Sequence, residues 1–108
     1  MTTCVEYLDV RGKSRFGAWF DKLNPTTAAR ITRAVRNMEY GNFSNAKPIG
    51  DGVSEYRIDA GPGYRLYYAR DGEKVVLLLG GGTKRGQQKD IDRAKRDWAD
   101  YKSRRQQE

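Results

Sequence analysis

An alternation of apolar and polar residues opens the chain, and helical spacing replaces it after Ser14. The polar start contains Val5, Tyr7 and Val10, which predict a short strand over residues 3–9. Apolar residues at helical spacing follow, and they are Phe16, Trp19, Phe20 and Leu23. Because such residues share one face of a helix, the pattern predicts a first helix that ends at Asn24-Pro25.

A second helical stripe begins after this turn. Its apolar residues are Ile31, Ala34, Val35 and Met38. Thr26 or Thr27 can cap this helix, and Gly41-Asn42 is expected to end it. Two helices joined by a short turn predict an antiparallel helical hairpin.

Strand and turn signals alternate in the second half of the chain. Residues 43–52 show no period and are rich in Asn, Ser, Pro and Gly, which predicts a loop. The three strands predicted after it cover residues 53–59, 64–70 and 74–79. Asp71-Gly72 is a strong signal for a tight hairpin between the last two.

Three consecutive glycines, residues 80–82, are expected to end the last strand. A final helix over residues 87–102 carries its apolar residues on one side, and they are Ile91, Ala94, Trp98 and Tyr101. The order of elements predicts an α+β fold in which helices cover one face of a mostly antiparallel sheet. The length fits a single domain over residues 1–108, with residues 103–108 as a frayed polar tail.

Composition and charge narrow the classes of function. The chain has 21 Lys and Arg against 14 Asp and Glu, a formal net charge of +7, so polyanions and above all nucleic acids are expected partners. It has no His, so any acid–base chemistry must use other groups. Because Cys4 is the single cysteine, we expect no disulfide and no zinc site, and we expect no cofactor. Because the sequence has no long apolar run, we expect no membrane partner and a cytoplasmic location.

Four polar side chains of neighbouring strands are predicted to share one face of the sheet. Strand period places Glu55 with Arg57 and Arg65 with Tyr67, and pairing of the two strands brings them together on the open surface. They form a candidate site. The alternative is a solvated sheet face, with a Glu–Arg pair worth less than about 1 kcal/mol.

A basic turn after the glycines is the second candidate feature. It runs over residues 80–88 and contains Lys84, Arg85 and Gln88, with Lys89 next to it. Glycines allow close backbone approach and a helix N-terminus favours anions, so the turn suits a phosphate group. It lacks the residue order of a Walker loop.

Four stretches of the sequence resemble one known family. They are Phe16 to Leu23, Ser54 to Ile58, Gly61 to Tyr68 and Thr83 to Ile91. These resemble the RelE/HigB-type toxins of bacterial toxin–antitoxin modules, and in particular the phage-related addiction module killer protein branch. The resemblance is collinear over residues 4–101. It implies a RelE-like fold and a ribonuclease that cuts messenger RNA at the ribosome. It also implies a cognate antitoxin, expected to be a helix-turn-helix protein, that holds the toxin inactive.

The resemblance also implies site residues. Arg65 matches the arginine of the family's Gly-Tyr-Arg strand, and Arg57 falls near the position of a basic strand residue of the founding members. Lys84 or Arg85 matches the family's basic pair after the last strand. Two departures stand out. Glu55 replaces a second strand lysine, and the catalytic tyrosine of the last segment has no counterpart, since residues 90 and 91 are Asp and Ile.

The chemistry implied is metal-independent cleavage in which the ribose 2′-hydroxyl attacks the adjacent phosphorus. Arg57 and Arg65 are expected to stabilise the developing negative charge, because a guanidinium stays protonated and matches phosphate oxygens. Glu55 is the candidate general base, since it lies on the same strand face as Arg57 and there is no His to take that role. Lys84 is a further catalytic candidate, expected to clamp the leaving-group side or a neighbouring phosphate. The RNA-binding candidates are Arg85, Gln88, Lys89 and Tyr67, and Tyr67 could stack on a base or donate a proton.

Three alternatives remain open from the sequence. One is a toxin of the same superfamily that inhibits DNA gyrase without nuclease activity, because one fold hosts both functions. Another is a non-catalytic nucleic-acid-binding module, whose binding would depend strongly on salt. The third is one half of a tight complex, whose surface serves mainly its partner protein.

Overall fold

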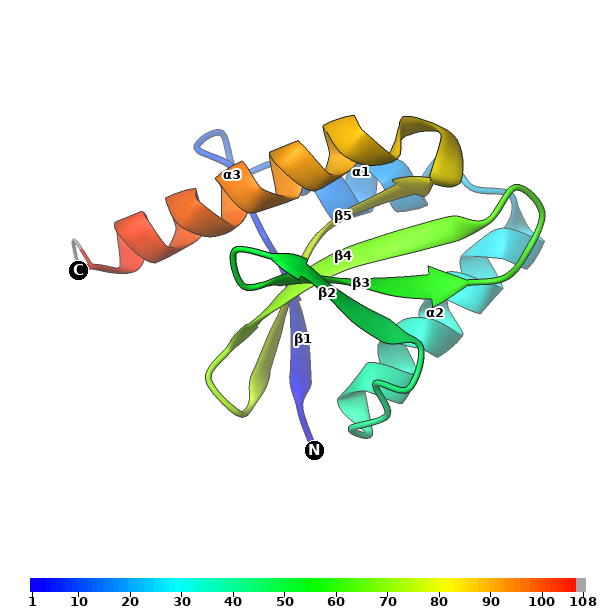
Figure 1. Cartoon of the computed structure of the whole chain (residues 1–108), viewed down its shortest axis with the longest axis horizontal. Helices are drawn as coiled ribbons and strands as arrows, with labels where there is room; N and C mark the ends of the chain where they lie inside the picture. The colour runs from blue at the N-terminus through cyan, green and yellow to red at the C-terminus, as the bar shows by residue number, and fades with distance from the viewer. Residues whose placement is uncertain (107–108) are drawn as a thin grey trace.

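The computed structural model describes residues 1–106, which form a five-stranded sheet with helices on both faces (Figure 1). The elements in chain order are β1 (Thr3–Glu6), α1 (Arg15–Phe20), α2 (Pro25–Glu39), β2 (Ala46–Gly50), β3 (Val53–Ile58), β4 (Tyr64–Asp71), β5 (Val75–Thr83), a 3-10 turn (Lys84–Gly86) and α3 (Gln87–Gln106). The strand order is β1-β5-β4-β3-β2. β1 runs parallel to β5 and the other neighbours are antiparallel, which confirms an α+β fold with a mostly antiparallel sheet.

The apolar stripe of α2 covers one face of the sheet. Ile31 and Met38 are fully buried there against β3, β4 and β5, as the helical spacing predicts. The helix begins differently from the prediction. Asn24 is its N-cap, with a side-chain oxygen that accepts a 2.9 Å hydrogen bond from the Thr27 amide, and Pro25 occupies the first turn.

Helix α3 covers the opposite face, so the predicted one-sided arrangement is wrong. Ala94 and Trp98 of α3 form a second core with residues of β3, β4 and β5, among them Val53, Tyr67 and Leu77. The reason lies in the central strand. β5 is apolar on both faces, so a single helical layer would leave one of them in water.

The predicted antiparallel helical hairpin is not confirmed. α1 is a short helix that lies against β5, whereas α2 lies against β1 and β3. The side chain of Ser14 caps α1 and accepts a hydrogen bond from the Gly17 amide. Different strands therefore position the two helices, and neither one depends on the other as its main neighbour.

The strands also differ from the prediction, and β1 ends at Glu6 instead of residue 9. Residues 46–50, predicted as part of a loop, form the edge strand β2, which pairs with β3 on one side. Pro48 is compatible with an edge strand, because the missing amide proton is not needed on the open side. β5 continues through the glycines to Thr83 instead of ending at residue 79. At Gly81 a side chain would collide with the ring of Trp19, so this glycine serves close packing.

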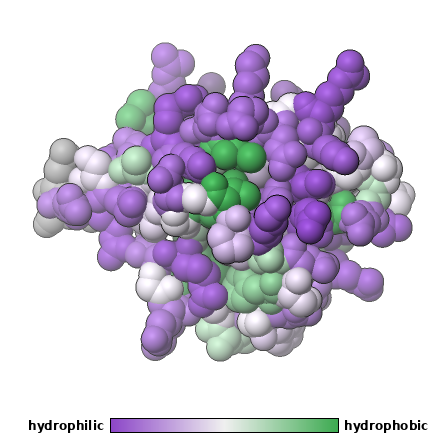
Figure 2. Space-filling model, viewed as in Figure 1, coloured by the Kyte–Doolittle hydropathy of each residue, from purple (hydrophilic) through white to green (hydrophobic). Residues whose placement is uncertain are grey.

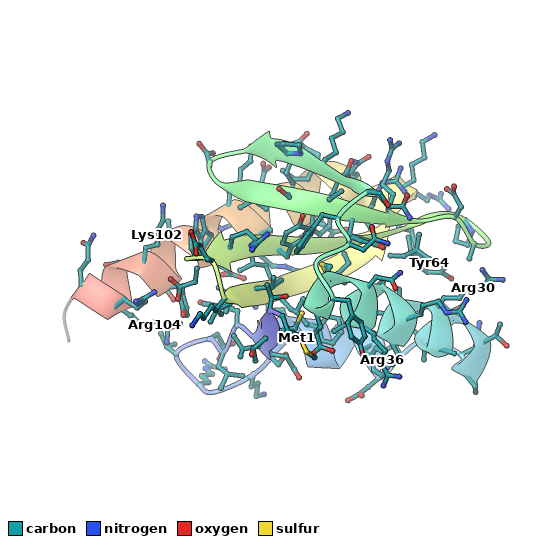
Figure 3. The ribbon with its side chains drawn as sticks, turned by 90° about the horizontal axis from the view of Figure 1, so that it is seen from below. Met1, Arg30, Arg36, Tyr64, Lys102 and Arg104 are labelled. Carbon is teal, nitrogen blue, oxygen red and sulfur yellow. The ribbon has the colours of Figure 1, made fainter. Side chains whose placement is uncertain are left out.

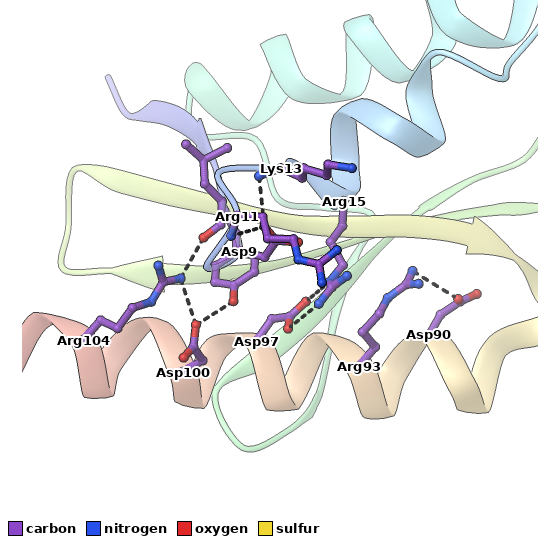
Figure 4. Close-up of polar contacts among 11 residues, drawn as sticks. Asp9, Arg11, Lys13, Arg15, Asp90, Arg93, Asp97, Asp100 and Arg104 are labelled. Carbon is purple, nitrogen blue, oxygen red and sulfur yellow. Dashed lines mark hydrogen bonds and ion pairs between the residues drawn. The ribbon is translucent and has the colours of Figure 1, made fainter.

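Helix α3 also extends beyond its predicted end. It reaches Gln106, so residues 103–106 are not the frayed tail that was predicted, and Gln107 and Glu108 lie outside the described residues. Contacts back to the N-terminal segment hold this last part, since the Arg104 guanidinium donates a 2.7 Å hydrogen bond to the Leu8 carbonyl (Figure 4). Hydrophilic side chains dominate the face seen in Figure 2. Within residues 1–106, no helix has the length and apolarity needed to cross a membrane.

Candidate nucleic-acid interface

The pairing of β3 with β4 aligns four of the predicted site residues. Arg57 lies directly opposite Arg65, and Glu55 lies directly opposite Tyr67. Residues opposite one another in an antiparallel pair point to the same face of the sheet. The prediction that these four side chains share one face is therefore confirmed.

Their exposure differs from the prediction, because the first turns of α3 cross this face (Figure 1). Glu55 is 4% exposed and Tyr67 is 1% exposed. The side chain of Arg65 is 11% exposed, and only Arg57 among the four lies open to solvent. The expectation of an open surface is thus wrong for three of the four. Strand alternation shows which side chains share a face but not what covers that face.

Glu55 is held in place by two partners from different elements. Its Oε2 lies 3.3 Å from Nε of Arg65 on β4 and accepts a 3.1 Å hydrogen bond from Nε2 of Gln87 on α3. A buried carboxylate is stable only when it is paired and hydrogen-bonded. The ion pair thus holds the Arg65 guanidinium beside Glu55, although the buried Nε makes no hydrogen bond among the described residues, and the bond from Gln87 ties the start of α3 to the sheet. Gln87 was not among the predicted site residues.

The hydroxyl of Tyr67 is buried, and within the described part of the chain it has no hydrogen-bond partner. Burial, together with the neighbouring carboxylates of Asp90 and Glu55, raises the pKa of Tyr67 to about 12. The phenol is therefore protonated at neutral pH. Its ring belongs to the core under α3.

Asp90 is a second carboxylate of this region that the sequence reasoning did not select. Gly82 pairs with Arg65 in the sheet, and a side chain at Gly82 would collide with the Asp90 carboxylate. The glycine thus makes room for Asp90 above the end of β5. Burial raises the pKa of Asp90, and the cations of Arg93 and Lys89 oppose that rise.

The basic turn lies at the same end of the sheet. The amide of Lys84 donates a 3.2 Å hydrogen bond to the carbonyl of Gly63, two residues before Arg65 in the chain. Lys84 and Arg85 are both exposed, as is Lys89 in the first turn of α3. We call Arg57, Arg65, Lys84 and Arg85 the cation cluster. Gln88, also exposed, donates a hydrogen bond to Asp92 of its own helix.

A groove of about 490 Å³ extends from this region toward α1. It begins at Gly82 and Asp90, and the cations that line it are Lys13, Arg15, Lys22 and Arg93. The sequence reasoning missed these cations, because they come from segments that only the tertiary fold brings beside α3. Arg15 and Arg93 are paired with Asp97 and Asp90, so Lys13 and Lys22 are the cations of this groove that an anionic chain can meet without breaking an ion pair of the described residues.

An ion pair fixes α3 above the site. Nε of Arg15 on α1 lies 2.6 Å from Oδ2 of Asp97, a buried residue of α3 (Figure 4). Tyr7 donates a 2.6 Å hydrogen bond to Asp100 one turn further along. Helix α3 is therefore anchored at its start by the sheet, through Gln87, and further along by the N-terminal segment.

One family model matches most of the chain. The model of the family described as phage-derived protein Gp49-like (DUF891) matches residues 18–100. An uncharacterized protein of Haemophilus influenzae is 38% identical over 89 residues, which span 82% of this chain and 90% of that protein. The matched region includes the cation cluster, Glu55, Tyr67 and Asp90.

Proposed function

Because this chain belongs to the family of phage-derived Gp49-like proteins, we propose that it is a toxin that cuts messenger RNA during translation. The family is associated with addiction module killer toxins and is consistent with the toxin of a toxin–antitoxin module. Such a module implies a cognate antitoxin as the partner of this chain. Beyond this family-level role, we propose a ribonuclease activity and membership of the RelE/HigB type of toxin.

The observation that carries the proposal is the convergence of cations at one end of the sheet. Arg57 and Arg65 are direct neighbours on one face, and the Lys84 backbone is bonded to the connection between their strands. A guanidinium presents a planar pair of donors to phosphate oxygens and keeps its charge at any physiological pH. This cluster is suited to a phosphate whose negative charge increases during reaction.

In the proposed reaction, the ribose 2′-oxygen forms a bond to phosphorus as the bond to the 5′-oxygen of the next nucleotide breaks. A base takes the 2′-hydroxyl proton and an acid protonates the leaving oxygen. The products carry a 2′,3′-cyclic phosphate and a 5′-hydroxyl. In this reaction Arg57 and Arg65 stabilise the charge on the phosphorane oxygens, and Lys84 assists on the side of the leaving group. The flanking RNA is bound by Arg85, Gln88 and Lys89.

The two carboxylates take different roles in this proposal. Glu55, the base candidate from the sequence, is buried against Arg65 and Gln87, which supports a positioning role. Burial raises the pKa of Asp90, whose carboxylate lies over Gly82, the residue that pairs with Arg65 in the sheet. A base is more effective when its pKa is raised toward the working pH. Asp90 is therefore our candidate for the proton acceptor. The buried ring of Tyr67 supports a packing role rather than stacking on a base.

The test is to induce the protein in cells and map the 5′ ends of messenger RNA. We expect new ends in register with codons, together with growth arrest. Arg57→Ala and Lys84→Ala should each reduce cleavage about a hundredfold, the usual effect of losing one charge-stabilising donor. Lys74→Ala is the matched control, because Lys74 is an exposed cation at the opposite end of β5. Intact transcripts with double-strand DNA breaks would contradict the proposal and indicate a gyrase inhibitor.

A further inference from the structure

A second basic surface lies on the other face of the sheet, between α2 and the β2–β3 edge. It is a groove of about 890 Å³. Its cations are Arg30 and Arg33 of α2. Arg57 of β3 also borders it, but strand alternation turns the Arg57 side chain to the α3 face. Figure 3 shows Arg30 beside the end of the sheet where Tyr64 lies, and Arg36 on the side of α2 that faces away from the sheet.

The two arginines of α2 in this groove are exposed and available to a ligand. Among residues 1–106, none of the ion pairs includes Arg30 or Arg33, although Asp59 also lines the groove. Positive charge that has no internal partner attracts an anionic ligand, and Arg clusters of this kind recognise acidic motifs.

The rest of the lining distinguishes between anionic ligands. Ala29, Ala46 and Ile58 provide small apolar surfaces, and Asn45 provides an amide that can bond to a peptide backbone. The aromatic ring in the lining is that of Tyr56, which is 2% exposed. Single-stranded nucleic acid binds through bases stacked on exposed rings. The lining therefore fits a peptide better than it fits RNA.

We propose that this groove binds an acidic segment of a partner protein, with carboxylates on Arg30 and Arg33 and small apolar side chains on the alanines. The inference rests on the proposed function in one respect, because the partner is then the antitoxin. Arg57 borders the groove through β3, while its side chain belongs to the cation cluster on the other face of the sheet. The groove and the cation cluster are therefore separate binding surfaces joined by one strand.

The test uses the isotope-labelled full chain and two probes in separate NMR titrations. One probe is a synthetic peptide of alternating glutamate and alanine, and the other is an oligouridylate of equal charge. We expect the peptide to shift the amide signals of Ala29, Ala46 and Ile58. Arg33→Glu should weaken peptide binding at least about tenfold, the scale of one lost charge-assisted contact. Arg36→Glu is the matched control, since Arg36 is an exposed arginine of the same helix that does not line the groove.

Three results would overturn the inference. The peptide leaves the groove signals unchanged, or Arg33→Glu and Arg36→Glu weaken it equally, or the oligouridylate binds the groove and the peptide does not. The last result would assign the groove to RNA. None of these measurements depends on cleavage, so a failure of this inference is distinguishable from a failure of the ribonuclease proposal.

Discussion

The carboxylate of Glu55 on β3 and the guanidinium of Arg65 on β4 lie 3.3 Å apart beneath the first turn of α3. Both side chains are largely buried, and Gln87 of α3 completes the contact. One ion pair thus links the stability of the sheet to the direction of a cation that the proposed reaction uses. Stability and activity can be separated at this pair by mutation.

Arg65→Ala should destabilise the protein by about 3 kcal/mol or more, because it leaves the Glu55 charge buried without a partner. The double variant Glu55→Gln with Arg65→Met should recover most of that stability, since no charge then remains buried. It should stay inactive on RNA. Urea denaturation of the two variants and the parent protein measures the difference. Equal losses in the single and double variants would show that the pair is not coupled.

Asp90→Asn should stabilise the protein at neutral pH and reduce RNA cleavage. Burial raises the pKa of Asp90 above its ordinary value of 3.8, so the folded state favours the neutral carboxyl. That stabilisation is complete below the ordinary pKa and is lost as the pH rises through the raised pKa. Asn stays neutral at all pH values, so the gain should appear at pH 7 and vanish in acid.

Denaturation curves of Asp90→Asn and the parent protein, recorded at neutral and at acidic pH, check this prediction. Asp92→Asn is the matched control, because Asp92 is an exposed carboxylate of the same helix. A variant that is equally stabilised at both pH values would point to a cause other than the charge. Full RNA cleavage by Asp90→Asn would remove this residue from the candidates for the base.

Tyr67→Phe should leave the protein as stable as before, or more stable, with unchanged RNA cleavage. The hydroxyl is buried and has no partner among the described residues, so removing it relieves a desolvation cost. The parent protein should also lose stability as the pH rises from 10 toward the raised pKa of about 12, and the variant should lose less. Thermal unfolding at neutral and alkaline pH measures both effects. Strong destabilisation at neutral pH would reveal a hydrogen bond of this hydroxyl.

Gly81→Ala should destabilise the protein by about 1–3 kcal/mol, the usual cost of overpacking, because the new methyl group meets the ring of Trp19. The combination with Trp19→Leu should cost less than the sum of the two single changes. Gly82→Ala should cost less stability than Gly81→Ala, since Asp90 can turn its carboxylate aside. Denaturation of the four variants tests this order.

The sequence predicts local features of the fold well and the coverage of the sheet poorly. Period and turn signals identify β3, β4, the Asp71-Gly72 hairpin and the stripe of α2, because each depends on neighbours in the chain. Edge strand β2 carries Pro48 and has few apolar residues, so nothing local distinguishes it from a loop. Gly81 stands in a run of three glycines, which predicts the end of a strand. Its actual role is to leave room for the ring of Trp19, a residue distant in the sequence.

For the candidate site, too, the sequence predicts what depends on local pattern and misses what depends on the tertiary fold. Alternation correctly places Arg57 and Arg65 on one face, since the strand period requires it. The burial of Glu55 follows from α3, whose path over the sheet is a tertiary property. Asp90 and the arginines of α2 were missed for the same reason, because their neighbours come from other segments.

The most direct test concerns the chemistry at the cation cluster. Once the cut site in a translated messenger RNA is mapped, the same RNA is prepared with a single 2′-deoxy nucleotide on the 5′ side of the cut. We expect the normal RNA to give a 2′,3′-cyclic phosphate end in the presence of ribosomes, and the substituted RNA to stay intact at that position. Equal cleavage of the two RNAs would contradict attack by the 2′-hydroxyl and, with it, the proposed role of the arginines.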